Sequence, residues 1–118
     1  MTVLEQLASE AIRLGFDMLE VEYKDGCEEV VALKGGLGFG IARFPSASLE
    51  STSLREELYQ ITKKRRRRRL TVENREYDLR GRMFESFGEN AFRVELRCVQ
   101  KSPAPDRPRR GSRRASLK

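Results

Sequence analysis

The residues with the clearest chemical potential form a run of seven consecutive basic side chains at positions 63 to 69. Lysine and arginine at this density can neutralise several phosphates of a polyanion, with an affinity that falls steeply as salt rises. Two other interpretations stay open: the run offsets the acidic residues 1–62, or it deters pairing at the edge of a strand. The run consists of Lys63, Lys64, Arg65, Arg66, Arg67, Arg68 and Arg69. Its aromatic neighbours, Tyr59 and Tyr77, do not alternate with the basic residues, which argues against a regular stacking platform for single strands.

A glycine cluster at positions 35 to 40 is the second candidate. A phosphate-binding loop needs a helix after its glycines and a Lys-Ser/Thr pair, and a dinucleotide fingerprint needs a different spacing. Here the following residues alternate as a strand, so neither type of loop is expected. Gly38 and Gly40 fall on one face of that strand. We expect a helix or another backbone to pack closely on this bare face.

Residues for catalysis or metal binding are scarce. The chain has no histidine, which excludes a histidine-based triad, zinc site or acid/base, and its two cysteines cannot build a cysteine-rich metal site. We expect Cys98 to be a small buried hydrophobe, whereas Cys27 has no obvious cationic neighbour. Four acidic residues are expected to be solvated charges rather than a carboxylate site: Glu20, Glu22, Glu28 and Glu29. The sequence therefore predicts a protein that is not an enzyme and uses no cofactor or metal.

The net charge of +6 lies entirely in the last 18 residues, because residues 1–100 hold equal numbers of acidic and basic side chains. The segment 101–118 is rich in arginine and proline and almost without apolar residues, so we predict a disordered basic tail. Ser112 and Ser116 each follow an Arg-Arg-x pattern that basophilic kinases accept, although such a pattern arises easily by chance here. A solvated tail that adds affinity for anions is favoured over phosphorylation.

Hydrophobic periodicity indicates the elements that position these residues. The stretch from Thr2 to Glu5 fits a capping box for a first helix, which Gly15 would close. Alternating residues then predict an antiparallel meander of three strands over 19–24, 30–33 and 37–42, with turns at 25–26 and 34–36. Pro45 would stop the sheet, and residues 46–53 would form a loop.

The second half repeats this order of elements. We predict a second capping box at Ser53 to Glu56, a helix through Ile61, strands over 70–73 and 77–80, a bulge near Gly81 and a hairpin loop at 86–90. The last strand spans 92–98. The order αβββαβββ predicts an α+β fold: an antiparallel sheet of about six strands with two helices on one face. Residues 1–100 would form one domain.

No stretch approaches the length of a membrane span, and the N-terminal residues lack the features of a signal peptide. With few cysteines and no export signal, the expected location is the cytoplasm.

Three stretches carry a family resemblance. Residues 11–22 join a helix through a small loop with Asp17 to a strand, Tyr23 to Gly26 form a hairpin, and Ala91 to Leu96 show an aromatic-Arg-apolar pattern. Together, over about residues 3–98, they resemble the N-terminal domain of type II secretion and type IV pilus assembly ATPases. The chain lacks the histidine common in the first strand of those domains and has no Walker motifs. The resemblance implies a PAS-like module that contacts protein partners and does not hydrolyse ATP.

Two functions follow as expectations. The first is a non-catalytic interaction module with a protein partner, which regulates or accompanies a secretion or pilus assembly. Its contact surfaces would be the uncovered sheet face, the strand with Gly38 and Gly40, and the basic run. The second is a nucleic-acid or other polyanion-binding protein that uses Lys63 to Arg69 and the basic tail. The sequence leaves the oligomeric state open.

Overall fold

The computed structural model describes residues 1–86 and 88–99, and it begins with the predicted helix. Helix α1 spans Val3–Arg13. The Thr2 hydroxyl accepts the Glu5 N–H at 3.2 Å, and the Glu5 carboxylate accepts the Thr2 N–H at 3.1 Å. The capping box is therefore confirmed with both of its hydrogen bonds. Gly15 follows with a φ of +92°, the left-handed conformation expected of a residue that ends a helix.

The predicted meander comes next. Strands β1 (Met18–Lys24), β2 (Cys27–Lys34) and β3 (Leu37–Pro45) pair antiparallel in chain order. Two-residue turns at 25–26 and 35–36 join them, and all four turn residues have a positive φ. This conformation matches the twist of the flanking strands and explains why Asp-Gly and Gly-Gly occupy these turns.

Helix α2 begins earlier than predicted. It spans Leu49–Thr62, and its N-cap is Ser48, whose hydroxyl accepts the Ser51 N–H at 3.1 Å. The predicted capping box at Ser53 is wrong, because Ser53 lies inside the helix. Ser48 also donates a hydrogen bond to the carbonyl of Pro45 at 2.7 Å, which ties the helix start directly to the end of β3. The connecting loop is correspondingly short.

The second set of strands forms a continuous antiparallel ladder. Strand β4 spans Arg68–Val72, β5 spans Arg75–Ser86, and β6 spans Glu89–Val99. The β5–β6 register runs without a shift from Glu76 to Ser86, so the predicted bulge near Gly81 is wrong. The register shift in this sheet lies instead between β2 and β3, at Val30 and Val31.

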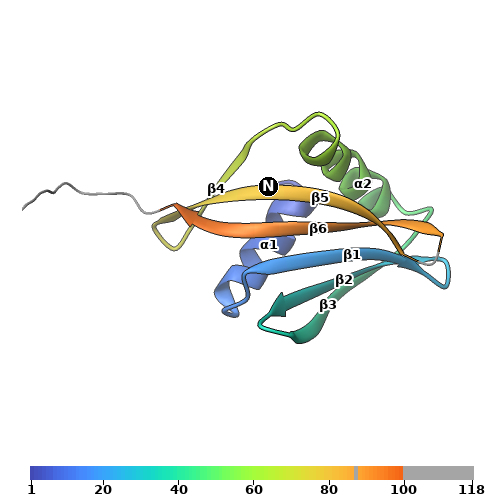
Figure 1. Cartoon of the computed structure of the whole chain (residues 1–118), viewed down its shortest axis with the longest axis horizontal. Helices are drawn as coiled ribbons and strands as arrows, with labels where there is room; N and C mark the ends of the chain where they lie inside the picture. Colours follow the sequence, from blue (N-terminus) through green and yellow to red (C-terminus); the bar gives the residue numbers. More distant parts are fainter. Residues whose placement is uncertain (87, 100–118) are drawn as a thin grey trace, which may run out of the picture.

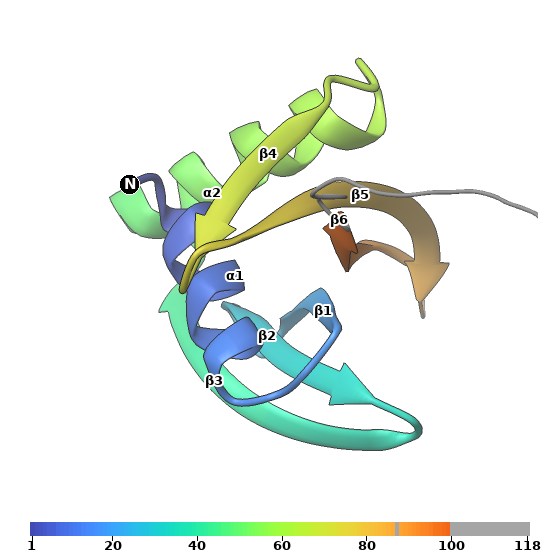
Figure 2. The same ribbon diagram turned by 90° about the vertical axis from the view of Figure 1, so that its left-hand side faces the viewer.

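The six strands form one sheet in the order β3-β2-β1-β6-β5-β4, with the N-terminal β1 paired to the C-terminal β6. Both helices cover one face, as predicted, and Figures 1 and 2 show the strands curling around them. The core between the layers is aliphatic. Its fully buried members include Leu4, Leu54 and Leu58 from the helices and Leu19, Val21, Leu79 and Val94 from the sheet.

Among the described residues, no helix covers the opposite face of the sheet, which is called the outer face below (Figure 2). No helix of this part of the chain is long and apolar enough to cross a bilayer. The predicted disordered tail at 101–118, with Ser112 and Ser116, lies outside the described residues.

Candidate anion-binding site

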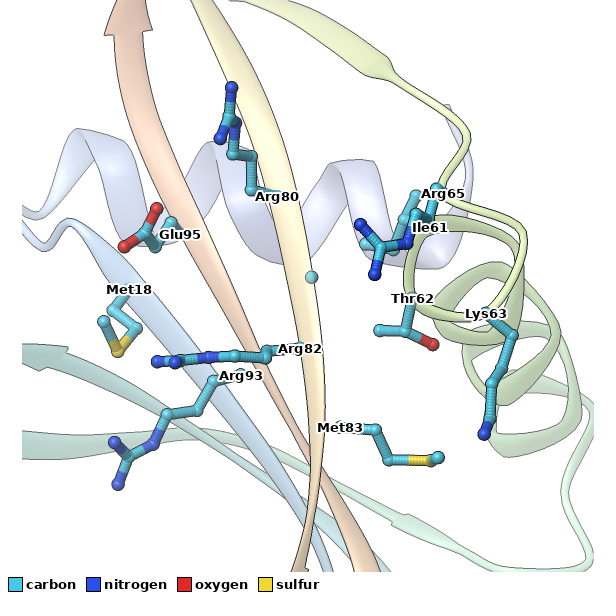
Figure 3. Close-up of a pocket in the computed structure, with 11 residues that line it drawn as sticks. Met18, Ile61, Thr62, Lys63, Arg65, Arg80, Arg82, Met83, Arg93 and Glu95 are labelled. Atoms are coloured by element: carbon cyan, nitrogen blue, oxygen red, sulfur yellow. The ribbon is translucent and has the colours of Figure 1, made fainter.

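A groove of about 650 Å³ opens where the last turn of α2 meets β5 and β6 (Figure 3). Five basic side chains line it together with a single acidic one, Glu95. The basic residues come from two strands and one loop: Lys63 and Arg65 follow α2, Arg80 and Arg82 lie on β5, and Arg93 lies on β6. The remaining lining residues are apolar or small: Met18, Ile61, Thr62, Gly81 and Met83. This surface is called the basic groove below.

Gly81 explains how α2 can approach the strand so closely. Strand β4 pairs with β5 only as far as Leu79, and the end of α2 packs beside β5 beyond that point. A Cβ atom at position 81 would lie 2.8 Å from Cγ2 of Thr62 and 2.9 Å from Cγ1 of Ile61. The absence of a side chain at Gly81 therefore brings Lys63 and Arg65 to the strand that carries Arg80 and Arg82.

The close approach predicted for Gly38 and Gly40 is not found there. A Cβ atom at Gly40 would meet nothing within 4 Å, and one at Gly38 would meet only the Leu33 and Val31 side chains of the neighbouring strand. β3 lies at the edge of the sheet and pairs only with β2. Among the described residues, no helix or further backbone packs on these two glycines. The glycine that a helix does approach is Gly81.

Strand alternation places like charges opposite one another in the groove. Arg82 on β5 is the direct cross-strand partner of Arg93 on β6. Like charges in this position are destabilising unless another charge compensates them. The Arg93 guanidinium is partly compensated, because its Nε lies 2.8 Å from the Glu20 carboxylate and its Cζ lies 5.1 Å from the centroid of the Phe84 ring. Arg82 has no ion-pair partner in the described part of the chain.

Figure 3 shows that the basic side chains flank β5 on both sides, with Arg80 and Arg82 on one side and Lys63 and Arg65 on the other. Arg80 lies 3.9 Å from Asp78, which is a loose contact between its Nε and the carboxylate. Within residues 1–86 and 88–99, Lys63 and Arg65 have no ion-pair partner. Three of the five basic groups are therefore uncompensated.

The basic run of the sequence divides into two parts with different roles. Its last three residues are paired: Arg67 with Asp78 at 3.1 Å, Arg68 with Glu57 at 3.0 Å, and Arg69 with Glu76 at 3.2 Å. Arg68 also reaches Glu5 of α1 at 3.4 Å. Arg68 fits the predicted compensation of residues 1–62, whereas Arg67 and Arg69 pair with acids of β5. Arg68 and Arg69 also fit the predicted charged edge, since they lie on the edge strand β4.

The first four residues of the run are exposed, and two of them, Lys63 and Arg65, line the basic groove. Arg66 and Arg67 line a smaller adjoining hollow of about 270 Å³, which shares Arg65 and Arg80 with the groove. Lys64 lines neither. The structure adds Arg80, Arg82 and Arg93, which the sequence analysis missed because they are isolated along the chain and only the strand register gathers them.

The acidic residues singled out in the sequence act mainly as ion-pair partners. Glu28 is buried rather than solvated, with its carboxylate 2.9 Å from Arg55 of α2. Glu29 lies 3.7 Å from Arg43, and Glu20 holds Arg93 as described above. No group of three or more metal-binding side chains occurs among the described residues.

Both cysteines differ from expectation. Cys98 is exposed, because the pairing of β6 with β1 ends at Glu95 and the last residues of β6 extend beyond the core. Cys27 is half-buried and does have a cationic neighbour, since a hydrogen bond with Cys27 and the nearby charge of Glu29 raise the pKa of the Arg43 guanidinium. Both thiols are free.

No model of a known protein family matches this chain, and no curated protein shows significant similarity to it. The resemblance to secretion and pilus assembly ATPases therefore stays a prediction.

Proposed function

We propose that this protein binds the phosphate backbone of a nucleic acid in the basic groove. The observation that carries the proposal is the gathering of five basic side chains around a single acid, Glu95, from the end of α2 and from strands β5 and β6. A charge run in a sequence is weak evidence, because such runs are often solvated. A set of charges that the fold brings together in one groove is stronger evidence, since their proximity depends on the strand register.

The electrostatics of the groove favour an anionic ligand. Arg82 and Arg93 face each other as like charges, and Arg82 has no ion-pair partner among the described residues. A phosphate between them would relieve this repulsion and accept hydrogen bonds from both planar guanidinium groups. Lys63 and Arg65 across β5 would contact further phosphates along the same backbone (Figure 3). Each contact would release counterions and strengthen binding at low salt.

Fluorescence anisotropy with labelled DNA and RNA, measured at several salt concentrations, tests the proposal. We expect binding at low salt and a linear decrease of log K with log[salt]. The Arg82→Gln variant should make this negative slope less steep, by about 0.7 for a single strand or about 0.9 for a duplex. The matched control is Arg13→Gln, which removes the same charge from an exposed position on α1 and should leave the slope nearly unchanged. No binding at low salt, or equal effects of both variants, would contradict the proposal.

A protein-contact function is a second proposal, and one feature of the sheet supports it. Edge strand β3 carries exposed apolar side chains, with Leu37 68% and Phe39 54% exposed, whereas the opposite edge strand β4 is short and carries charged side chains. An unguarded edge of this kind can add a strand from a partner. Hydrogen exchange of the β3 amides tests this, because strand addition would protect them in the complex. A partner in a secretion or pilus assembly is proposed here only from the family resemblance.

A further inference from the structure

We infer that the basic groove takes unpaired nucleotides in preference to a duplex, an inference that rests on the proposed function. The reason lies in the side chains between the charges. Met18 on β1 and Met83 on β5 are both half-buried groove-lining residues, whereas Ile61 of α2 also lines the groove but is only 4% exposed. Figure 3 shows Met18 on one side of β5, and Met83 and Ile61 on the other. The groove therefore offers apolar surface on both sides of the strand that carries Arg80 and Arg82.

The two kinds of nucleic acid differ in what they can present to such a surface. A duplex exposes its phosphates but keeps the faces of its bases stacked inside, so only the charges of the groove would be used. An unpaired strand exposes the flat faces of its bases beside each phosphate, and every base has such a face, so contact with it needs no particular sequence. Methionine suits this contact, because its flexible, polarisable thioether packs well against aromatic rings. The mixture of charged and apolar groups fits a ligand that has both.

Arg93 strengthens the argument because its side chain is already held in place. The Glu20 carboxylate fixes one edge of the guanidinium at 2.8 Å, and the Phe84 ring lies against it at 5.1 Å. The side chain nevertheless stays 44% exposed. A planar cation positioned in this way can stack on a base as well as pair with a phosphate. It also has little side-chain freedom left to lose on binding.

The outer face next to the groove gives the bases room. Met18 is the register partner of Leu33 on β2, and Leu33 is in turn the partner of Gly38 on β3. Within the described residues no helix covers these positions, and an added Cβ at neighbouring Gly40 would face open space. Glu20 and Glu29 on the same part of the sheet already hold Arg93 and Arg43 in ion pairs, which leaves less positive charge there for a phosphate. The backbone is therefore expected to stay at the groove while a base lies toward Met18.

The experiment compares three ligands with the full chain: a labelled single-stranded oligonucleotide, the duplex of the same sequence, and inorganic polyphosphate as a base-free competitor. We expect the single strand to bind about two- to tenfold more tightly than the duplex, which corresponds to one contact between a methionine and an aromatic ring. At the same concentration of negative charge, polyphosphate should displace the single strand less well than an unlabelled single strand does. A fluorescent base analogue in the single strand should change its emission on binding, because stacking alters its surroundings.

Variants separate stacking from charge. Replacing both methionines, Met18→Ser with Met83→Ser, should remove the preference for the single strand and leave the salt slope unchanged. The volume-conserving control, Met18→Leu with Met83→Leu, should keep the preference and shows whether the fold tolerates changes at these sites. Equal affinity for duplex and single strand, or efficient displacement by polyphosphate, would overturn the inference and leave the proposed function intact. No binding of any of the three ligands at low salt would overturn both.

Discussion

At the scale of single residues, Gly81 determines the geometry of the groove, because it permits the contact between α2 and β5. A methyl group there would overlap Thr62 Cγ2 at 2.8 Å and Ile61 Cδ1 at 3.0 Å, so the helix end or the strand would have to move. Gly40 lies in the same sheet, and an added Cβ there would meet nothing within 4 Å. The two glycines thus form a natural pair of test and control.

We predict that Gly81→Ala destabilises the protein by about 1–3 kcal/mol, the usual range for overpacking a close contact. Gly40→Ala should be neutral or slightly stabilising, because alanine restricts the unfolded chain. Urea unfolding followed by circular dichroism measures both, and the m value should stay constant. If both substitutions had the same effect, the packing of α2 on Gly81 would not be the cause.

Arg68 is the second residue on which the packing depends, since it joins both helices to the edge strand. Its Nη1 lies 3.0 Å from Glu57 of α2 and 3.4 Å from Glu5 of α1. Glu57 is only 8% exposed, and its second carboxylate oxygen has no hydrogen-bond partner in the described structure. Arg68 is thus the principal compensation of a buried charge.

We predict that Arg68→Met destabilises by about 3 kcal/mol, at the low end for a broken buried ion pair because a quarter of the Arg68 side chain is exposed. Arg13→Met breaks an exposed pair with Glu73 and should change stability by less than about 0.5 kcal/mol. Adding Glu57→Gln to Arg68→Met should recover part of the loss, because the buried charge is then removed. Thermal melts of the three variants measure these differences, and a failure of the double variant to recover would refute the account.

At the scale of elements, the sequence predicted most of the fold because local signals agreed with tertiary structure. The strands predicted from alternating apolar residues, the Asp-Gly turn and the first capping box all occur in the structure at the predicted positions. The start of α2 was missed for a physical reason. Ser46, Ser48, Ser51 and Ser53 all have a hydroxyl that can cap a helix, and the choice of Ser48 depends on its second bond to Pro45 at the end of β3.

The candidate site was predictable only in part. Lys63 and Arg65 belong to a contiguous basic run that the sequence shows directly. Arg80, Arg82 and Arg93 are separate in the sequence and join them only through the β5–β6 register and the packing of the end of α2. The sequence placed the close glycine contact at Gly38 and Gly40 because several glycines in a strand are conspicuous. A single glycine in the longest strand, Gly81, gives no such local signal of a helix from another part of the chain.

The N-cap of α2 gives a prediction at this scale. Ser48→Ala should destabilise by about 1 kcal/mol, because it removes the acceptor for the Ser51 N–H. Ser53→Ala should be neutral or stabilise by up to about 0.5 kcal/mol, because Ser53 is an exposed residue inside the helix and alanine is the better helix former. Urea midpoints of the two variants provide the measurement. If Ser53→Ala were the more destabilising of the two, the N-cap would lie at Ser53, as the sequence predicted, and not at Ser48.

At the scale of the whole molecule, charge is distributed in two parts that should act differently. Residues 1–100 are neutral in sum, yet the fold concentrates uncompensated basic groups at one groove. The net charge of +6 belongs to residues 101–118, which contain seven basic residues and one acidic residue. Charges in a groove with fixed geometry can select among ligands. Charges in an arginine-rich segment with almost no apolar residues contribute attraction to any polyanion.

This difference leads to a prediction for the tail. Replacing its basic residues by glutamine, at positions 101, 107, 109, 110, 113, 114 and 118, should weaken binding of both single strands and duplexes. The salt dependence of both should become less steep, and more so for the duplex, because each phosphate contact on a duplex releases more counterions; the single strand should stay the preferred ligand. Anisotropy titrations at two salt concentrations, beside those of Arg82→Gln, provide the comparison. If the tail variant lost all binding at low salt, or lost the single-strand preference, the tail rather than the basic groove would be the binding site.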